Sequence, residues 1–348
     1  MSDNILSLIY TFSKKFSDPK TNLAFDPQNN NISAIIKEGN VNIFLRVSGD
    51  EIDVYKDILK LLKNNVAQIP GVISVNIALT SEKNDKKSTQ KFKIDAKNII
   101  AIASGKGGVG KSTFAVNLSV ALQTLGMKVG LLDADIYGPS VPRMMGVSKK
   151  PEMNSDKKLI PIINYGIKCM SIGFILEDES PTIWRGPMIM KALEQMFNGV
   201  EWGILDYLII DLPPGTGDAQ LTLAQSSKLS GSIVISTPQE VALTDARKGI
   251  NMFKKVGVDI LGIVENMSYF ICDNCNEKHF IFSKDGAIKE ADKFKVPFLG
   301  SIPINKQLRQ QSDTGQPSCI DNPDGEISKI YLMIAKKINQ SLNTKRSL

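Results

Sequence analysis

Residues 105–113 read Gly105-Lys106-Gly107-Gly108-Val109-Gly110-Lys111-Ser112-Thr113, and this stretch decides both the fold and the ligand class. It follows the pattern G-x-x-x-x-G-K-[ST], in which backbone N–H groups surround nucleotide phosphates, a lysine reaches the β- and γ-phosphates and a hydroxyl binds Mg²⁺. The fixed positions of the pattern are Gly105, Gly110, Lys111 and Ser112. The stretch therefore predicts a phosphate-binding loop for ATP or GTP with Mg²⁺.

The segments on either side of this loop have the pattern that the motif requires. Residues 98–103 are an apolar run typical of a buried parallel strand, and residues 112–126 have the apolar spacing of a helix. An ordinary glycine-rich turn is the alternative, but strand, lysine, hydroxyl and helix in register favour nucleotide binding. The phosphates would lie at a helix N-terminus, where free N–H groups and the helix dipole favour anions.

Strands and helices alternate after the loop, which predicts an α/β fold with a doubly wound, mostly parallel sheet. Further strands are expected at residues 129–132, 208–210, 233–236, 260–264 and 297–302. Ligands of such sheets collect at the carboxyl ends of the strands.

A smaller α+β module precedes this domain. Its expected elements are a helix at 4–16, strands at 31–37 and 41–47, a helix at 53–66 and a strand at 72–79. We therefore predict three parts: a module at 1–80, a polar linker at 81–97 and a P-loop ATPase domain at 98–348. The lysine-rich linker lacks interleaved aromatic residues, which favours a solvated segment over a nucleic-acid surface, so no nucleic-acid partner is expected.

Composition indicates a globular protein: 42% of the 348 residues are hydrophobic, 22% are charged and the net charge is +6. No apolar run approaches the roughly 18 residues of a membrane span, and the N-terminus lacks the pattern of a signal peptide, so we expect a cytoplasmic protein. The C-terminal helix expected at 324–342 carries one apolar stripe. Packing on the core is favoured over membrane anchoring because the stripe is narrow and lacks Trp and Phe, and no stable membrane association is expected.

Three aspartates follow predicted strands. Asp133 and Asp135 come after the strand at 129–132, and Asp211 ends the run 207–211 in a Walker B pattern. One such aspartate alone would be read as a turn or an N-cap. Three beside a phosphate-binding loop instead predict the metal and water chemistry of nucleotide hydrolysis. The sequence Asn-Lys-x-Asp, which is typical of GTP-binding G proteins, does not occur at the end of the predicted strand at 260–264, where Asn266 stands. ATP is therefore preferred over GTP.

The pair Cys272 and Cys275 supplies half of a four-sulfur site. Zn²⁺ and a [4Fe–4S] cluster each need about four protein ligands, and a two-fold dimer is the simplest way to complete the set. A structural zinc bridge and a redox dithiol stay open, and His279 is either a third ligand or a solvated loop residue. Cys169 and Cys319 stand in apolar surroundings and are expected to be inert thiols.

The loop resembles the deviant Walker A motif of the SIMIBI-class ATPases, the group that contains MinD, ParA and nitrogenase iron protein. In that group the early lysine, here Lys106, reaches the partner's nucleotide, so the resemblance implies a homodimer. It also implies that Asp135 orients the attacking water, that Asp133 lies in the outer shell of the metal and that Asp211 acts in catalysis. By the same likeness Gly215 offers its N–H to the γ-phosphate, and Asn266 contacts adenine or, alternatively, only makes strand-end hydrogen bonds.

The order of the motifs is more specific. The loop, residues 133–140, 184–188 (WRGPM), 211–218 and 265–270, and the cysteine pair together resemble the Mrp/ApbC iron–sulfur cluster carriers over about residues 98–339. That resemblance implies a [4Fe–4S] cluster that bridges two subunits through Cys272 and Cys275. It further implies ATP hydrolysis during the cycle, and apo iron–sulfur proteins and an assembly scaffold as partners.

Two other functions remain. One is a partitioning or positioning ATPase of the ParA/MinD type, whose dimer zinc would bridge through the cysteine pair. Its activity has no need of that pair, so the presence of the pair argues against it. The other is nitrogenase-like electron transfer, which uses cluster cysteines that lie far apart in sequence. Residues 1–80 resemble the iron–sulfur assembly accessory domain often fused in front of such ATPases. Members of that family often carry a reactive cysteine, and here none precedes Cys169.

Overall fold

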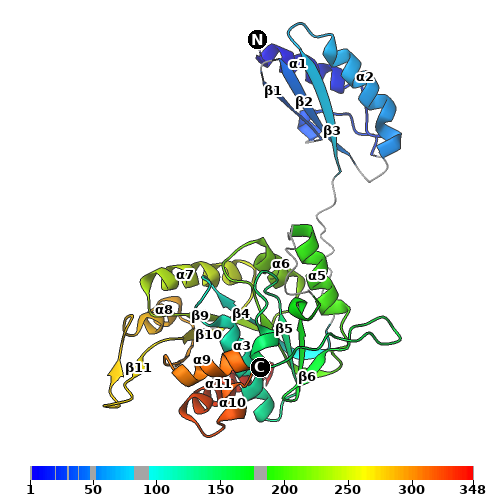
Figure 1. Cartoon of the computed structure of the whole chain (residues 1–348). Coiled ribbons are helices and arrows are strands. Elements are labelled where there is room, and N and C mark those ends of the chain that lie inside the picture. Colours follow the sequence, from blue (N-terminus) through cyan, green and yellow to red (C-terminus); the bar gives the residue numbers. More distant parts are fainter. Residues whose placement is uncertain are drawn as a thin grey trace. The chain divides into compact units, whose positions relative to one another are not determined.

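The chain divides into two compact units, Met1–Thr89 and Gln90–Leu348 (Figure 1). The computed structural model describes residues 2–19, 21–29, 31–37, 39–47, 52–81, 94–175 and 186–347. Most of the predicted linker, and Trp184 and Arg185 of the motif at 184–188, lie outside the described residues.

The first unit is a three-stranded sheet with two helices. Strand β2 pairs antiparallel with β1 and parallel with β3, and every second residue of β2 is buried, as expected for a sheet with one covered face. Helix α1 ends at Ser13, three residues before its predicted end. The chain turns there, and the backbone carbonyl of Phe16 accepts a hydrogen bond from the N–H of Phe25 at 2.9 Å. The elements are α1 (Ser2–Ser13), β1 (Ile32–Lys37), β2 (Asn40–Val47), α2 (Lys56–Ala67) and β3 (Ser74–Ser81), with short 3-10 helices at Pro27–Asn29 and Ile52–Tyr55.

The second unit is built on an eight-stranded sheet of order β13-β10-β9-β4-β8-β5-β7-β6. All neighbours are parallel except β6, which returns antiparallel on β7. The sequence patterns did not predict β6 and β7, a short hairpin that turns through Tyr165 and Gly166, both with positive φ. The strands are β4 (Ala96–Ser104), β5 (Val129–Asp133), β6 (Ile162–Asn164), β7 (Ile167–Ser171), β8 (Leu205–Asp211), β9 (Gly231–Ser236), β10 (Ile260–Glu265) and β13 (Phe298–Ser301). The doubly wound, mostly parallel sheet is therefore confirmed.

Helices cover both faces of this sheet (Figure 1). The β4–α3–β5 and β9–α7–β10 connections run toward opposite edges, so right-handed crossovers place α3 and α7 on opposite faces. The helices are α3 (Lys111–Thr124), α4 (Val141–Met144), α5 (Gly186–Asn198), α6 (Asp218–Ser226), α7 (Glu240–Lys255), α8 (Gly286–Phe294), α9 (Lys306–Thr314), α10 (Ser318–Asp321) and α11 (Glu326–Ser347). A separate two-stranded hairpin pairs β11 (Phe270–Ile271) with β12 (Lys278–His279).

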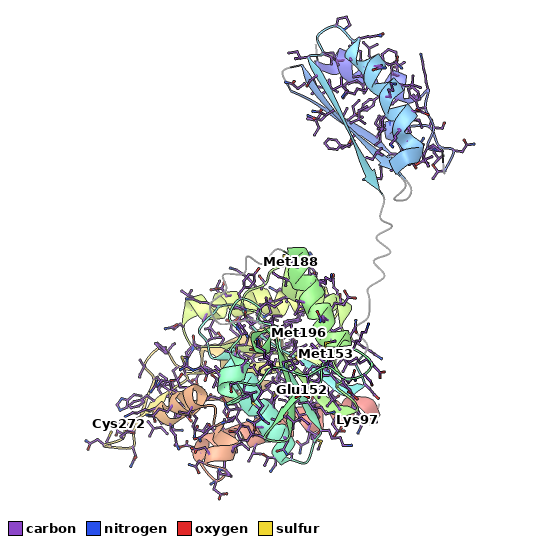
Figure 2. The ribbon with its side chains drawn as sticks, turned by 45° about the vertical axis from the view of Figure 1, so that its right-hand side comes forward. Lys97, Glu152, Met153, Met188, Met196 and Cys272 are labelled. Carbon is purple, nitrogen blue, oxygen red and sulfur yellow. The ribbon has the colours of Figure 1, made fainter. Side chains whose placement is uncertain are left out.

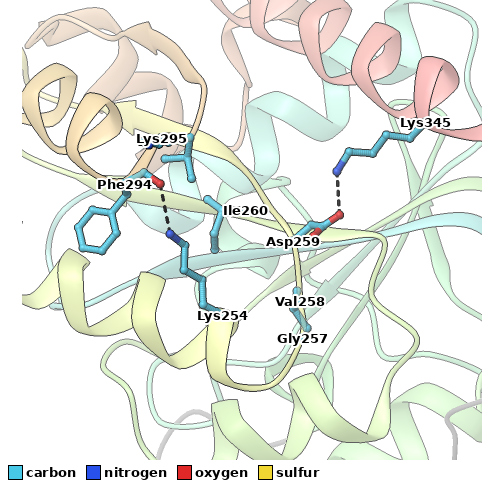
Figure 3. A pocket seen from close by; sticks show the side chains of 9 residues that line it. Lys254, Gly257, Val258, Asp259, Ile260, Phe294, Lys295 and Lys345 are labelled. Carbon is cyan, nitrogen blue, oxygen red and sulfur yellow. Dashed lines mark hydrogen bonds and ion pairs between the residues drawn. The ribbon is translucent and has the colours of Figure 1, made fainter.

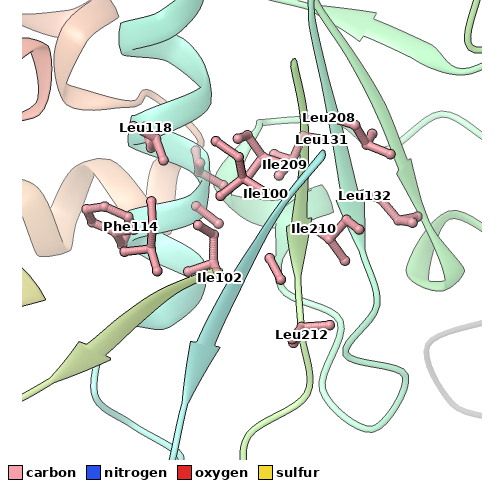
Figure 4. Packing of buried hydrophobic residues seen from close by; sticks show 14 of the residues in the cluster. Ile100, Ile102, Phe114, Leu118, Leu131, Leu132, Leu208, Ile209, Ile210 and Leu212 are labelled. Atoms are coloured by element: carbon pink, nitrogen blue, oxygen red, sulfur yellow. The ribbon is translucent and has the colours of Figure 1, made fainter. Parts of the chain in front are cut away.

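The main core lies between α3 and strands β4, β5 and β8 (Figure 4). Helix α11 covers the outer side of α3, where the rings of Tyr331 and Phe114 lie 5.8 Å apart. The apolar stripe of α11 is buried, which confirms that this helix packs on the core. No helix in the described part of the chain combines the length and hydropathy of a bilayer-spanning segment.

Candidate nucleotide and metal sites

The phosphate-binding loop lies between the carboxyl end of β4 and the first turn of α3. Gly108 and Gly110 have φ of +79° and +85°, conformations that favour glycine. Within the described residues, the N–H groups of residues 107–113 donate to no acceptor. Consecutive free N–H groups at the start of a helix form an anion-binding cradle. The geometry of the loop is therefore that of a phosphate site.

Two glycines of the loop are required by close contacts. A Cβ atom on Gly105 would lie 2.1 Å from the backbone carbonyl carbon of Asp245 in α7, and one on Gly110 would lie 2.2 Å from Nδ2 of Asn266. Both separations are below any real Cβ contact. Helix α7 and the end of β10 thus fix the loop in place.

We expect Gly105→Ala to lower the free energy of unfolding by about 3 kcal/mol or more, because the backbone of α7 must move to admit the methyl group. Gly107→Ala is the matched control, since its nearest outside atom would be Pro214 Cγ at 4.0 Å, and its effect should stay within about 0.5 kcal/mol. Urea denaturation of the nucleotide-free chain measures both. Equal stabilities of the two variants would contradict the contact.

A buried cluster of charges lies beside the loop. Lys111 Nζ is 2.6 Å from Asp211 Oδ1, 3.9 Å from Asp135 Oδ2 and 3.3 Å from Ser112 Oγ. Lys111 is 6% exposed and Asp211 is fully buried. The two aspartates come from the ends of neighbouring strands, β8 and β5, so the sheet brings together what the sequence separates by 76 residues (211 − 135).

The same cluster has oxygen atoms suited to a divalent cation. Asp135 Oδ1 and Asp211 Oδ2 are buried and have no hydrogen-bond partner in the described part of the chain. Burying carboxylate oxygens without partners is costly, and Mg²⁺ with its retained waters would satisfy them. The residues predicted from the sequence therefore fit Mg²⁺, with Ser112, Asp135 and Asp211 as the groups that would hold it, directly or through water. When bound, the ion supplies charge neutralisation at the phosphates.

Asp133 has a different environment from its two neighbours. Its Oδ1 accepts the N–H of Asp135 at 3.1 Å, and its Oδ2 accepts the N–H of Val141 at 3.1 Å and the hydroxyl of Ser171 at 3.0 Å. It thereby fixes the turn that carries Asp135. Burial and then the nearby Asp211 carboxylate raise the pKa of Asp133 to about 7. Burial also raises the pKa of Asp135, and Lys111 opposes that rise.

A pH effect on stability follows from Asp133. Its folded-state pKa lies above the ordinary value of about 4, so the folded chain holds the proton more tightly than the unfolded chain. Stability relative to a non-titrating variant should therefore fall as the pH rises from about 4 to about 7 and stay level above it. We expect the wild type to exceed Asp133→Asn in stability most at low pH, with a gap that narrows toward pH 7. Denaturation midpoints across this range test the sign, and parallel curves would disprove it.

Other predicted site residues lie at the same side of the sheet, where the strands have their carboxyl ends. Lys106 is exposed, and within the described residues its ammonium makes no ion pair. Thr113 Oγ1 lies 3.9 Å from Met144 Sδ. The N–H of Gly215 donates to Ser104 O at 2.9 Å, so the predicted contact with a γ-phosphate would require this bond to break. Asn266 is buried and donates from Nδ2 to Val109 O at 2.8 Å, which is a structural bond to the loop.

Glu265 is a residue that the sequence patterns did not single out. It is 1% exposed, and its two carboxylate oxygens accept the Ser268 hydroxyl and, at 2.7 Å, the N–H of Ala287 in the first turn of α8. It is the last residue of β10, directly before Asn266, at the start of the segment that leads to the cysteine pair. A glutamate in an otherwise apolar strand end was the signal that could have identified it.

The cysteine pair lies on the β11–β12 hairpin, at the outer edge of the second unit in Figure 2. Cys272 donates its N–H to Glu277 O at 3.0 Å, and Asn276 turns back with a φ of +56°. Hydrogen bonds from the N–H groups of Cys275 and then Asn274 lower the pKa of the Cys272 thiol. Ligand atoms of Cys272, Cys275 and His279 all lie within 4.8 Å of one another. The hairpin therefore gathers soft metal ligands at an accessible position.

The two remaining cysteines are not suited to bind a metal. Cys169 and Cys319 are buried, and burial raises their pKa to about 12 and about 11. They stay protonated, as predicted.

A cavity of about 330 Å³ lies near the amino end of β10, on the side of the sheet opposite to the nucleotide cluster (Figure 3). Two of its three lysines are already engaged: Lys254 donates to Phe294 O at 3.2 Å and Lys345 pairs with Asp259 at 2.7 Å. Lys254 thus neutralises the C-terminus of α8. This cavity is separate from the nucleotide cluster at the carboxyl ends of the strands.

Comparisons with known proteins agree with this geometry. The family model described as "ParA: NUBPL iron-transfer P-loop NTPase" matches residues 95–339. An "Iron-sulfur protein required for NADH dehydrogenase, mitochondrial" of Arabidopsis thaliana is 54% identical over 251 residues, covering 72% of this chain and 80% of that protein. An "Iron-sulfur cluster carrier protein" of Synechocystis sp. is 41% identical over 337 residues, 95% of this chain and 96% of that protein, so this likeness extends into the first unit.

A solved structure extends the likeness to the fold. The nucleotide-binding protein of Archaeoglobus fulgidus, in complex with ADP and with Co, has a TM-score of 0.61 and 39% identity, covering 70% of this chain and 97% of that one. The fold and the phosphate-binding loop thus agree with the sequence comparisons. The chain belongs to the P-loop NTPases of the ParA group, in the family of NUBPL iron-transfer P-loop NTPases.

Proposed function

We propose that this protein carries iron–sulfur clusters to apo-proteins and that ATP binding and hydrolysis drive the cycle. The observation that carries the proposal is the cysteine pair, with Cys272 half-buried and Cys275 exposed, on the β11–β12 hairpin. This hairpin follows the end of β10, where Asn266 is hydrogen-bonded to the phosphate-binding loop. Two accessible thiols suit a cargo that must be taken up and released. Relatives named as iron–sulfur cluster carrier or transfer proteins support the same function.

The nucleotide in this proposal is ATP with Mg²⁺. Lys111 and the N–H groups of residues 107–113 bind the phosphates, Ser112 binds the ion, and Asp135 and Asp211 position the ion and the attacking water. Asp133 holds the turn that carries Asp135. Gly215 reaches the γ-phosphate after releasing Ser104, and Asn266 contacts adenine. The relative from Archaeoglobus fulgidus that binds ADP supports an adenine nucleotide.

The cluster in this proposal is a [4Fe–4S] cluster that bridges a homodimer. One chain offers two cysteines in a C-x-x-C pair, and such a cluster takes about four thiolates, so a two-fold axis near the hairpin completes the set. The exposed Lys106 supports the same assembly, because it is free to reach the nucleotide of the partner subunit. The cluster is the cargo, and its release regenerates the open pair.

The partners in this proposal are apo iron–sulfur proteins and an assembly scaffold. Neither nucleic acid nor a stable membrane contact takes part. A cytoplasmic location remains a prediction, since the relative in Arabidopsis thaliana is named as mitochondrial.

Anaerobic reconstitution with iron and sulfide, followed by transfer to an apo-enzyme, tests this function. The expected result is one cluster per two chains, native mass of a dimer and activation of the apo-enzyme. A ParA/MinD-type ATPase with a zinc-bridged dimer would instead retain zinc and activate nothing. Stoichiometric zinc uptake without any iron uptake would overturn the carrier function.

A further inference from the structure

We infer that His279 is a third metal ligand, so that a single chain can hold one divalent transition-metal ion through two thiolates and one imidazole. The cluster proposed above uses only the two cysteines of each chain. This inference rests on that function only in placing metal chemistry at the same hairpin. It adds a mononuclear state that needs no second subunit.

The register of the hairpin places the histidine beside the pair. Phe270 pairs with His279, and Ile271 pairs with Lys278. Side chains alternate across a ribbon, so Cys272, two residues after Phe270, lies on the same face as His279. The bond from Cys272 N–H to Glu277 O, 3.0 Å long, continues this pairing one step further. The hairpin therefore aligns a thiol and an imidazole on one face.

The turn brings in the second thiol. Asn276 has a φ of +56° and donates its N–H to Cys272 O at 2.9 Å, which folds residues 273–276 back over the pair. All three ligand atoms lie within 4.8 Å of one another. Two ligands on one tetrahedral Zn²⁺ lie roughly 3.5 Å apart, given bond lengths of about 2.0–2.3 Å. Side-chain rotations alone can close that difference, because Cys275 and His279 are exposed and free to turn.

The chemistry of the three groups specifies the ion. Two thiolates and one imidazole suit Zn²⁺, Fe²⁺ or Co²⁺ and disfavour Mg²⁺ and Ca²⁺. Two thiolate charges also neutralise a divalent ion, which an exposed hairpin tolerates well. Three protein ligands leave the fourth tetrahedral position open, as in sites that exchange ligands, whereas closed structural zinc sites use four. His279 is the only histidine in the chain, so no other imidazole can substitute.

Anaerobic titration of the full-length, reduced chain with Co²⁺ tests this inference, because Co²⁺ reports sulfur and nitrogen ligands in its absorption spectrum. We expect one ion per chain in a monomeric state. His279→Ala should weaken binding by at least the 10- to 100-fold typical of losing even an outer-shell group, and should shift the ligand-field bands. Lys278→Ala is the matched control on the same strand, since that side chain lies over the Tyr269 ring at 4.5 Å, and it should bind like the wild type.

The possible failures are distinguishable. Equal Co²⁺ affinity and equal spectra for wild type and His279→Ala would overturn the third ligand, as would one ion per two chains. Cluster content after reconstitution with iron and sulfide should be the same in His279→Ala and wild type. If His279→Ala has wild-type cluster content and also binds Co²⁺ as tightly as the wild type, only this inference fails. If the wild type forms no cluster at all, the proposed function fails while the Co²⁺ result still decides the role of His279.

Discussion

Lys111→Ala is expected to abolish ATP hydrolysis, with a loss of at least about 100-fold. The side chain is the one buried cation at the start of α3 within the described residues, and Asp211, at 2.6 Å, holds it beside the cradle of free N–H groups. The substitution removes the positive charge that is proposed to neutralise the β- and γ-phosphates. Phosphate release and binding of a fluorescent ATP analogue measure the two losses separately.

The same substitution should also destabilise the nucleotide-free chain. It leaves the fully buried Asp211 without its partner, and breaking a buried pair in this way costs about 3–5 kcal/mol, or less where the carboxyl takes up a proton. Lys106→Ala is the matched control: that lysine is exposed, so stability should not change while hydrolysis falls if it acts across a dimer. Wild-type hydrolysis by Lys111→Ala would disprove the assigned role.

Cys275→Ser and Cys272→Ser should each reduce bound iron and sulfide to the background level after anaerobic reconstitution. Losing one thiolate per chain leaves a bridging site with two sulfur ligands of the four that it needs, and a serine hydroxyl replaces a soft thiolate poorly. Both changes fall on an exposed hairpin, so stability and ATP binding should remain at wild-type values.

Cys169→Ala provides the control for these two variants. Burial in β7 raises the pKa of the Cys169 thiol to about 12, so this group does not offer a thiolate and its loss should not change iron content. Iron and sulfide assays on equal amounts of each folded chain give the comparison. A pair variant that retains wild-type iron and sulfide would refute the assignment of the cluster to this hairpin.

Much of the nucleotide site could be predicted from sequence because its residues are local to strand ends. The loop at 105–113 and the aspartates at 133, 135 and 211 follow apolar runs, and parallel strands deliver their carboxyl ends to one edge. The hydrogen bonds between these separate strand ends could not be predicted. That Asn266 bonds to Val109 and that Gly215 bonds to Ser104 depend on how separate strand ends meet.

The sequence by itself determined the ligand class and the fold class. The pattern G-x-x-x-x-G-K-[ST] between an apolar strand and a helix favours nucleotide phosphates strongly over an ordinary turn, and the periodicity and turn signals that predict strands and helices are local. Tertiary structure alone decided the state of each charged group. Asp133 and Asp135 are two residues apart, yet one accepts three hydrogen bonds while the other keeps a buried oxygen without a partner in the described part of the chain. Burial and neighbouring charges set these states, and both come from strands and helices that are distant in sequence.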